Sequence, residues 1–379
     1  PTITLEEVNA LAKNIMSENN RVIIVTGQAK EGVKYPTQEE ILSLIKESAV
    51  AKVTPYTETV TTEPLVGELA ANAKVIEEKA DSKFGLTYWT LSNGVKVILK
   101  PTDFKADEIL MSASSPGGMS LINNEKACNG TFLGQVVSES GLKKMSKVEL
   151  GKMLAGKRAS ASLSVGELYE GVSGSSTPKD FETMLQLVFL KFTNVNFDKD
   201  VFDSFMSKQK MFLPTLTANP QLYFSLETIK IMNEGNPRFC FPFDSATLDK
   251  ANLDDIKTIY QDRFADASDF TFIFVGNFET NKNKPLIEKY LGNLPSIKRT
   301  ENWKDTSFKP PFEKIEKVIK KGVDDKSQVN ISFSGEAKYD KVDSKNLSAL
   351  GELLTIKLTE ILREEKGGVY GVGAFGGMG

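Results

Sequence analysis

Apolar residues near the N-terminus recur first at helical and then at strand spacing. A capping-box pattern at Thr4 opens a predicted helix, whose apolar positions follow a helical period: Leu5, Val8, Leu11, Ala12 and Ile15. The β-branched run 22–25 predicts a strand that stops at Gly27, and residues 39–46 show a second helical pattern. We therefore expect the order helix, strand, helix at this end of the chain.

The same order returns much later in the sequence. Residues 252–256 open a helix, residues 272–275 predict a strand that ends at Gly276, and Pro285 precedes another helix. Two copies of one pattern indicate two homologous domains, the first represented only by its C-terminal end. The alternative is a chance coincidence of two helix-strand-helix endings.

The stretch between the two copies predicts an exposed connector and then a new α+β domain. Residues 51–83 show weak periodicity, as expected of a linker. The pair Asn93-Gly94, between strand patterns at 86–91 and 95–99, suits a type I′ hairpin. Helices at 130–141, 146–155 and most of 178–233, with two short strands in 158–174, favour α+β over a doubly wound sheet.

The C-terminal part predicts two strands, a long helix and a last strand. The strands are expected at 313–320, 328–334 and 369–372. Asp343 or Ser344 should cap the helix, and Gly367 should end it. The helix would carry one continuous apolar face: Leu347, Leu350, Leu353, Leu354, Leu358, Ile361 and Leu362.

Composition narrows the possible functions. The 379 residues are 40% hydrophobic and 26% charged, which argues against wholesale disorder. A formal charge of -3 gives no general attraction to nucleic acid or anionic membranes, and no apolar run approaches a bilayer span. No signal peptide is visible, and the missing initiator methionine indicates that the chain begins inside a longer protein. The compartment, periplasmic or cytoplasmic, stays open.

The residue types present exclude several kinds of active site. With zero histidines, the chain has no imidazole base, Ser-His-Asp triad or histidine-ligated zinc. The two cysteines, Cys128 and Cys240, are too few for a cysteine-rich zinc site. They either pair or remain buried thiols, and we expect buried thiols because free cysteine is commonly a core residue. We predict no metal and no cofactor in this chain.

Two motif matches carry little weight. Gly371, Gly373 and Gly376 fit G-x-G-x-x-G but follow a helix instead of opening one, so a dinucleotide site is not expected. Ser140 and Lys143 fit S-x-x-K without the companion motifs of a serine hydrolase, and we interpret them as a helix end with a solvated lysine.

Arg363 and Tyr370 form a more informative pair. Arg363 lies in the last predicted helical turn, and Tyr370 follows the glycine turn. A guanidinium and a phenol placed in this way can donate hydrogen bonds to one substrate carbonyl as negative charge develops on its oxygen. The alternative is an arginine that compensates the helix dipole beside an ordinary strand tyrosine, and spacing alone favours that alternative.

Three segments together resemble one known family. They are the hairpin at 91–95, the strand at 274–278, and the helix end with its glycine turn at 362–370. Across its whole length the chain resembles the later part of a pitrilysin-like (M16 family) zinc metallopeptidase. Members pair two homologous halves, each of two α+β domains, around a closed chamber. The resemblance implies that Arg363 and Tyr370 bind the substrate backbone and stabilise the tetrahedral intermediate.

The resemblance also gives a meaning to the absence of histidine. In the family's catalytic half, the first helix after the opening hairpins carries H-x-x-E-H, which binds zinc and activates water. The corresponding positions here are Thr131 and Gln135 for the ligands and Gly134 for the base. A hydroxyl and an amide are poor zinc ligands, and glycine has no side chain. This helix therefore belongs to a degenerate half, with zinc expected in the absent N-terminal half.

The resemblance implies a division of the chain and a role for it. Residues 1–50 would end the preceding M16 domain, 51–83 form the linker, 84–297 form a degenerate domain, and 305–379 form a truncated final domain. The chain would be the noncatalytic part of a zinc endopeptidase, partnered by its N-terminal half and by peptide substrates. Two alternatives remain: a nonpeptidase relative that serves as a structural subunit, and an unrelated α+β binding module.

Overall fold

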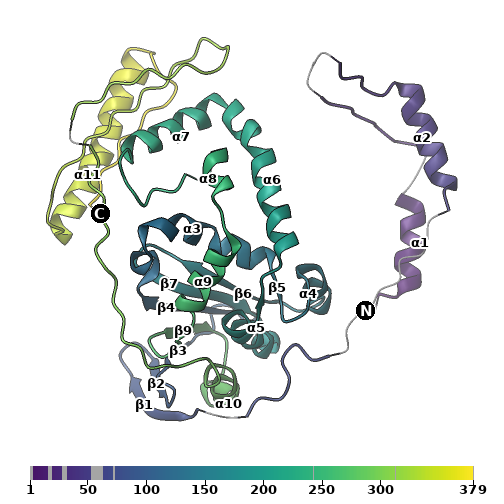
Figure 1. The fold of residues 1–379 in the computed structure, drawn as a ribbon, viewed down its shortest axis with the longest axis vertical. Helices are drawn as coiled ribbons and strands as arrows, with labels where there is room; N and C mark the ends of the chain where they lie inside the picture. The colour runs from purple at the N-terminus through teal and green to yellow at the C-terminus, as the bar shows by residue number, and fades with distance from the viewer. Residues whose placement is uncertain are drawn as a thin grey trace. The chain divides into compact units, whose positions relative to one another are not determined.

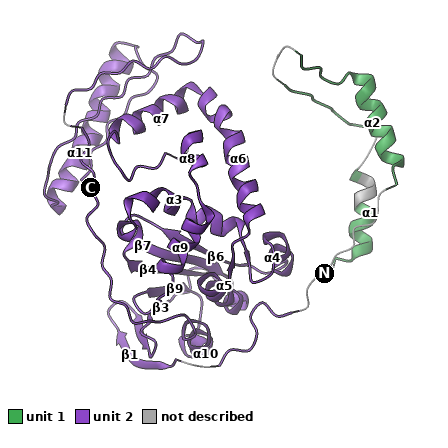
Figure 2. Ribbon diagram, in the orientation of Figure 1, with its two compact units in different colours: residues 1–59 green, residues 60–379 purple. Residues whose placement is uncertain are grey.

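The computed structural model describes residues 3–15, 19–27, 32–52, 63–70, 73–241, 243–311 and 313–378. Figure 1 shows the course of the chain and its elements. Contacts divide the chain into two compact units, residues 1–59 and residues 60–379, which Figure 2 colours separately. None of the helices in the described residues has the length and apolar character needed to cross a bilayer.

The first unit contains the two predicted helices, α1 (Leu5–Ile15) and α2 (Gln38–Val50). The capping box at Thr4 is confirmed, since the Glu7 amide donates to Thr4 Oγ1 and the Thr4 amide donates to Glu7 Oε2. The strand predicted at 22–25 is wrong: these residues are exposed and unpaired in the described part of this unit. The backbone N–H and C=O groups of a strand form hydrogen bonds with a neighbouring strand. The regular elements among the described residues of this unit are helices, so no such partner is present there.

The second unit is built on a seven-stranded sheet (Figure 1). Its strand order is β1-β2-β3-β9-β4-β7-β6, and every neighbouring pair is antiparallel except the parallel pair β3 and β9. The strands are β1 (Val75–Asp81), β2 (Leu86–Leu91), β3 (Lys96–Pro101), β4 (Ile109–Pro116), β6 (Ala159–Val165), β7 (Tyr169–Ser176) and β9 (Thr271–Gly276). Two short strands, β5 (Gly141–Leu142) and β8 (Val195–Asn196), pair separately. The predicted α+β class is confirmed.

Two details at the start of this domain differ from expectation. Residues 75–81, placed in the linker by the sequence, form edge strand β1, which pairs with β2. The hairpin at Asn93-Gly94 is present, but only Gly94 has a positive φ, of 96°, so the turn is not type I′. The Gly94 amide donates to Leu91 O at 2.8 Å, and the Leu91 amide donates to Val95 O at 2.9 Å. These bonds define a three-residue loop.

The helices of the second unit follow the predicted order closely. Up to residue 291 they are α3 (Asn124–Glu139), α4 (Lys147–Met153), α5 (Phe181–Thr193), α6 (Lys199–Ala218), α7 (Pro220–Met232), α8 (Ser245–Asp249), α9 (Leu253–Arg263) and α10 (Thr280–Leu291), with short 3₁₀ turns η1 (Gly118–Leu121) and η2 (Pro178–Asp180). Pro285 was expected before the last of these, but it lies inside α10. Phe272 and Phe274 of β9 are fully buried in the core.

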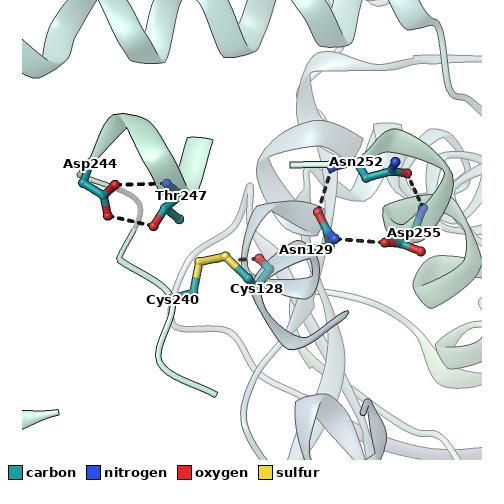
Figure 3. The surroundings of a disulfide bond; sticks show 7 residues. All are labelled: Cys128, Asn129, Cys240, Asp244, Thr247, Asn252 and Asp255. Carbon is teal, nitrogen blue, oxygen red and sulfur yellow. Dashed lines mark hydrogen bonds between the residues drawn. A yellow bond between two sulfur atoms is a disulfide. The ribbon is translucent and has the colours of Figure 1, made fainter. Parts of the chain in front are cut away.

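Cys128 of α3 and Cys240, which follows α7, form a disulfide with a Cα–Cα distance of 4.9 Å (Figure 3). The expectation of two buried thiols is therefore wrong. The two cysteines lie 112 residues apart in sequence, so spacing held no sign that folding brings them together.

The C-terminal part keeps its helix but not its strands. The long helix is α11 (Lys341–Leu358), continued by the π-helical turn η3 (Thr359–Glu365). Its N-cap is Asp340, which accepts from the Val342 and Asp343 amides, so the predicted caps Asp343 and Ser344 are wrong. Of the strands predicted at 313–320, 328–334 and 369–372, none forms in the described residues, which are mostly exposed and lack a sheet to join.

Candidate functional site

Helix α3 carries the positions that correspond to a metal-binding motif. Thr131 and Gln135 are exposed on one side of the helix, and Gly134 is half-buried near Leu163 O of β6. The opposite side of α3 is fully packed by Phe132, Leu133, Val136 and Val137. The apolar side of this helix therefore packs in the core independently of the residues at the motif positions on the exposed side.

The exposed side of α3 does not fit a zinc ion. A zinc site needs thiolate, imidazole or carboxylate ligands, and these positions offer a hydroxyl, an amide and no side chain. Within the described residues, no group of three or more histidine, cysteine or acidic side chains is arranged to hold a metal. We derive no metal-dependent step for this chain.

Arg363 lies in the π-helical turn that ends the long helix. Its side chain is 54% exposed, and its Nε lies 3.6 Å from Glu364 Oε1. The turn closes through Gly367, whose φ is 58° and whose amide donates to Arg363 O, and through the Gly368 amide, which donates to Leu362 O at 2.9 Å. The predicted glycine stop is confirmed, and π-helical turns of this kind are frequent at functional sites.

Tyr370 lies beyond this glycine turn with its side chain 97% exposed. Within the described residues, no hydrogen bond or ion pair joins it to Arg363. The structure places both side chains in solvent on the two sides of one turn. Their joint action on one substrate carbonyl remains a prediction from the sequence.

The chain after Tyr370 returns along α11. The Ala374 amide donates to Thr355 Oγ1 at 2.8 Å, and a Cβ added to Gly351 would lie 2.9 Å from the Gly376 nitrogen. Gly376 is equally close to the helix, because a Cβ there would meet Leu347 O at 2.6 Å. Of the three glycines that resembled a dinucleotide motif, Gly376 thus serves close packing against the helix.

A buried charge network lies elsewhere in the second unit, and sequence reasoning missed it. Arg263, at the end of α9, is 2% exposed and donates to both carboxylate oxygens of Glu301, at 3.1 and 3.2 Å. Its NH1 lies 3.8 Å from Glu170 Oε1 on β7, and the Gly118 amide donates to Glu170 Oε2 at 2.5 Å. Burial raises the pKa of Glu170 to about 7.

The same network also holds the chain segment that follows α10. This segment leaves the domain built on the seven-stranded sheet, which we call the sheet domain. The Arg299 amide donates to Asp266 Oδ2 at 2.5 Å, and Arg299 NH1 donates to Asp262 Oδ1 at 3.1 Å. Burial opposes ionisation of Asp266, but hydrogen bonds from Ser268 and Arg299 lower its pKa overall. No motif could reveal the network, because its members come from β7, α9 and the segment after α10.

Comparison with known proteins identifies the fold. Residues 250–378 match the family described as "Peptidase M16 inactive domain". A zinc protease PQQL-like from Arabidopsis thaliana is 23% identical over 381 residues, covering 98% of this chain and 37% of the relative. A probable zinc protease PqqL from Haemophilus influenzae is 22% identical over 300 residues, covering 79% of this chain and 32% of the relative.

A solved structure shows the same architecture. The periplasmic protease PqqL from Escherichia coli superposes with a TM-score of 0.65 at 21% identity, covering 89% of this chain and 37% of that one. The resemblance to M16 zinc metallopeptidases is confirmed, and the alternative of an unrelated module is wrong. The chain spans about a third of the length of the curated relatives it matches.

Proposed function

We propose that this chain, with its M16-type fold and M16 inactive-domain match, is the noncatalytic C-terminal part of a zinc-dependent endopeptidase. The N-terminal half would hold zinc and cleave peptides or unfolded polypeptides in a closed chamber. This chain would close that chamber and bind substrate. Helix α3 carries the proposal, because its core side is intact while its exposed side cannot hold a metal.

Arg363 and Tyr370 are the residues proposed to contact substrate. Both side chains are exposed, so their donors are available to a ligand. A guanidinium and a phenol donate hydrogen bonds that strengthen as a carbonyl oxygen becomes an oxyanion, which stabilises the transition state more than the bound substrate. They would act on a scissile carbonyl presented by the other half.

The nonpeptidase alternative, a structural subunit, would share the fold and the degenerate helix. The names of the curated relatives favour the protease, since they are described as zinc proteases. Arg363 and Tyr370 add support of a weaker kind, because a purely structural subunit has no need of two exposed donors beside one turn.

The proposal is tested first on the chain by itself. Purified residues 1–379 should contain no stoichiometric zinc and should leave a quenched fluorogenic peptide intact, measured by metal analysis and fluorescence. One tightly held zinc per chain, or cleavage by the chain alone, would contradict the assignment.

The second test uses the intact protease. Arg363→Ala and Tyr370→Phe should lower kcat more than they raise KM, with a loss of about 2–4 kcal/mol of transition-state stabilisation. Lys366→Ala removes a nearby exposed cation and serves as the control, with unchanged kcat. A pure KM effect would reduce Arg363 and Tyr370 to ordinary binding contacts.

A further inference from the structure

Residues 236–241, which we call the strap, run between α7 and α8 and attach to the start of α3. Arg238 NH1 donates to Ile122 O at 2.8 Å and to Asn124 Oδ1 at 2.9 Å, and its NH2 donates to Met119 O. Two residues later, Cys240 is bonded to Cys128 of α3 (Figure 3). The strap is therefore held by one side chain through hydrogen bonds and by another through a covalent bond.

The strap lies on the exposed side of α3. Helical spacing of four, three and four residues puts a single stripe on that side: Asn124, Cys128, Thr131 and Gln135. The disulfide thus joins the strap to α3 one turn before Thr131, on the same side as the two degenerate ligand positions. The strap and the altered motif occupy the same face.

The rest of the domain does not depend on the disulfide for its contacts. Asn129, next to Cys128, points to α9, where its Oδ1 accepts from the Asn252 amide at 2.8 Å and its Nδ2 donates to Asp255 (Figure 3). The apolar side of α3 packs in the core independently. Without the disulfide, α3 stays anchored to α9 and the core, while the strap is joined to the start of α3 by the hydrogen bonds of Arg238. At the far end of the strap, Phe241 stays buried beside Lys230 of α7.

Both cysteine residues are partly exposed, which places the bond near the protein surface. We infer that the Cys128–Cys240 disulfide is a thiol-exchange site whose reduction releases the strap from α3 while the seven-stranded sheet stays folded. The inference concerns this chain alone and does not depend on the proposed protease activity.

A dithiol supplies the two electrons that this step needs. One of its thiolates attacks a cysteine sulfur, the S–S bond breaks, and its electron pair leaves on the other cysteine, which takes a proton. The second thiol of the reductant then displaces the remaining cysteine from the mixed disulfide. The two cysteines gain two electrons and two protons in total, and the dithiol becomes a disulfide. A dithiol-disulfide oxidoreductase of an oxidising compartment would run the reverse step.

Hydrogen exchange with and without dithiothreitol tests the inference on the 379-residue chain. In the oxidised chain, iodoacetamide should modify neither cysteine, and after reduction it should modify both. Reduction should speed amide exchange in the strap by about tenfold or more while β4 and β9 keep their protection. Equal protection of the strap in both states would overturn the inference, as would loss of protection throughout the sheet.

A double variant provides the matched control. Cys128→Ser with Cys240→Ser should show the fast strap exchange of the reduced chain, and dithiothreitol should have no further effect on it. Arg238→Gln, which keeps the disulfide, should leave the oxidised strap largely protected. If Arg238→Gln alone frees the oxidised strap, hydrogen bonds and not the disulfide hold it, and the inference fails.

Discussion

The sheet domain and the C-terminal helix respond differently to the same kind of sequence signal. Strands β3 and β9 bury the apolar side chains of one face completely, as Val97, Leu99 and Phe272 show. Helix α11 carries an equally regular apolar stripe, yet Leu353 is 53% exposed and Leu350 and Leu354 are also exposed. An apolar pattern therefore sets the type of element, whereas burial depends on a partner surface.

The reason is that the two regions gain stability from different sources. In the sheet domain, helices cover the strands of the core, as α3 and α5 do against β6. In α11, the described contacts are local: its cap, its own turns and the returning tail. If α11 is the helix of a larger domain, as the proposed function implies, its stripe is the surface that the remainder of that domain would cover.

The largest expected difference between the regions comes from truncating one apolar side chain in each. Phe272→Ala should lower the free energy of unfolding by about 3–5 kcal/mol, because it leaves a cavity in a closed core. Leu353→Ala should change it by about 0.5 kcal/mol or less, since its side chain is already half in water. Urea unfolding followed by circular dichroism measures both variants. Equal losses would show that α11 is packed in solution and would end the comparison.

The second difference between the two regions is the effect of ionisation on stability. The sheet domain contains a buried charge network, whereas the charges of α11 are exposed. Glu170 has a pKa of about 7 in the folded chain against an ordinary value of 4.5, so its stabilising effect is complete below pH 4.5 and is lost as pH rises through 7. The loss is at most about 3 kcal/mol. Glu170→Gln should flatten this fall in unfolding free energy between pH 5 and pH 8.

The outcome that would contradict this prediction is an unchanged pH dependence in Glu170→Gln. Glu167→Gln, an exposed carboxylate just before β7, is the control and should keep the pH dependence of the wild type. Protonation of Glu170 removes an incompletely bonded buried charge, since its Oε1 accepts no hydrogen bond among the described residues.

The sequence predicted elements well wherever local rules decide them. The helices α3, α5 and α9, the hairpin at Gly94, and the glycine end of the long helix all follow from periodicity, caps and turns. The strands predicted at 22–25 and 313–320 failed because strand formation needs a pairing edge, which no local pattern contains. The same limit applies to the cap of α11, where Asp340 competed with two equally suitable residues.

The candidate site divides in the same way. The positions of Thr131, Gly134 and Gln135 on one helix were predictable from a family motif, and so was the turn between Arg363 and Tyr370. The disulfide and the Arg263 network were not, because Cys128 and Cys240, like Glu170 and Glu301, meet only through tertiary folding. Contacts between residues so far apart in sequence become visible only in the three-dimensional structure.

The cap of α11 gives a third and smaller test. Asp340→Ala removes the acceptor for the Val342 and Asp343 amides, which should cost about 1 kcal/mol locally. Because α11 has few other contacts, the loss should appear as faster amide exchange over 341–346. The matched variant in the sheet domain is Ser146→Ala, which removes the side-chain cap of α4. If exchange at the start of α11 is unaffected, the helix is stabilised by more than its local signals.

The smallest net effect is expected where two contributions oppose each other. Gly351→Ala should stabilise α11 by up to about 1 kcal/mol through helix propensity, but its new Cβ would lie 2.9 Å from the Gly376 nitrogen and push the tail away. Overall stability should change little, while the Ala374 amide loses its protection from exchange. Thr355→Ala should free the same amide without a clash, because it removes the hydroxyl that accepts from it. A protected Ala374 amide in both variants would mean that the tail is held by something other than this side of α11, and the helix would then be less isolated than its exposed stripe indicates.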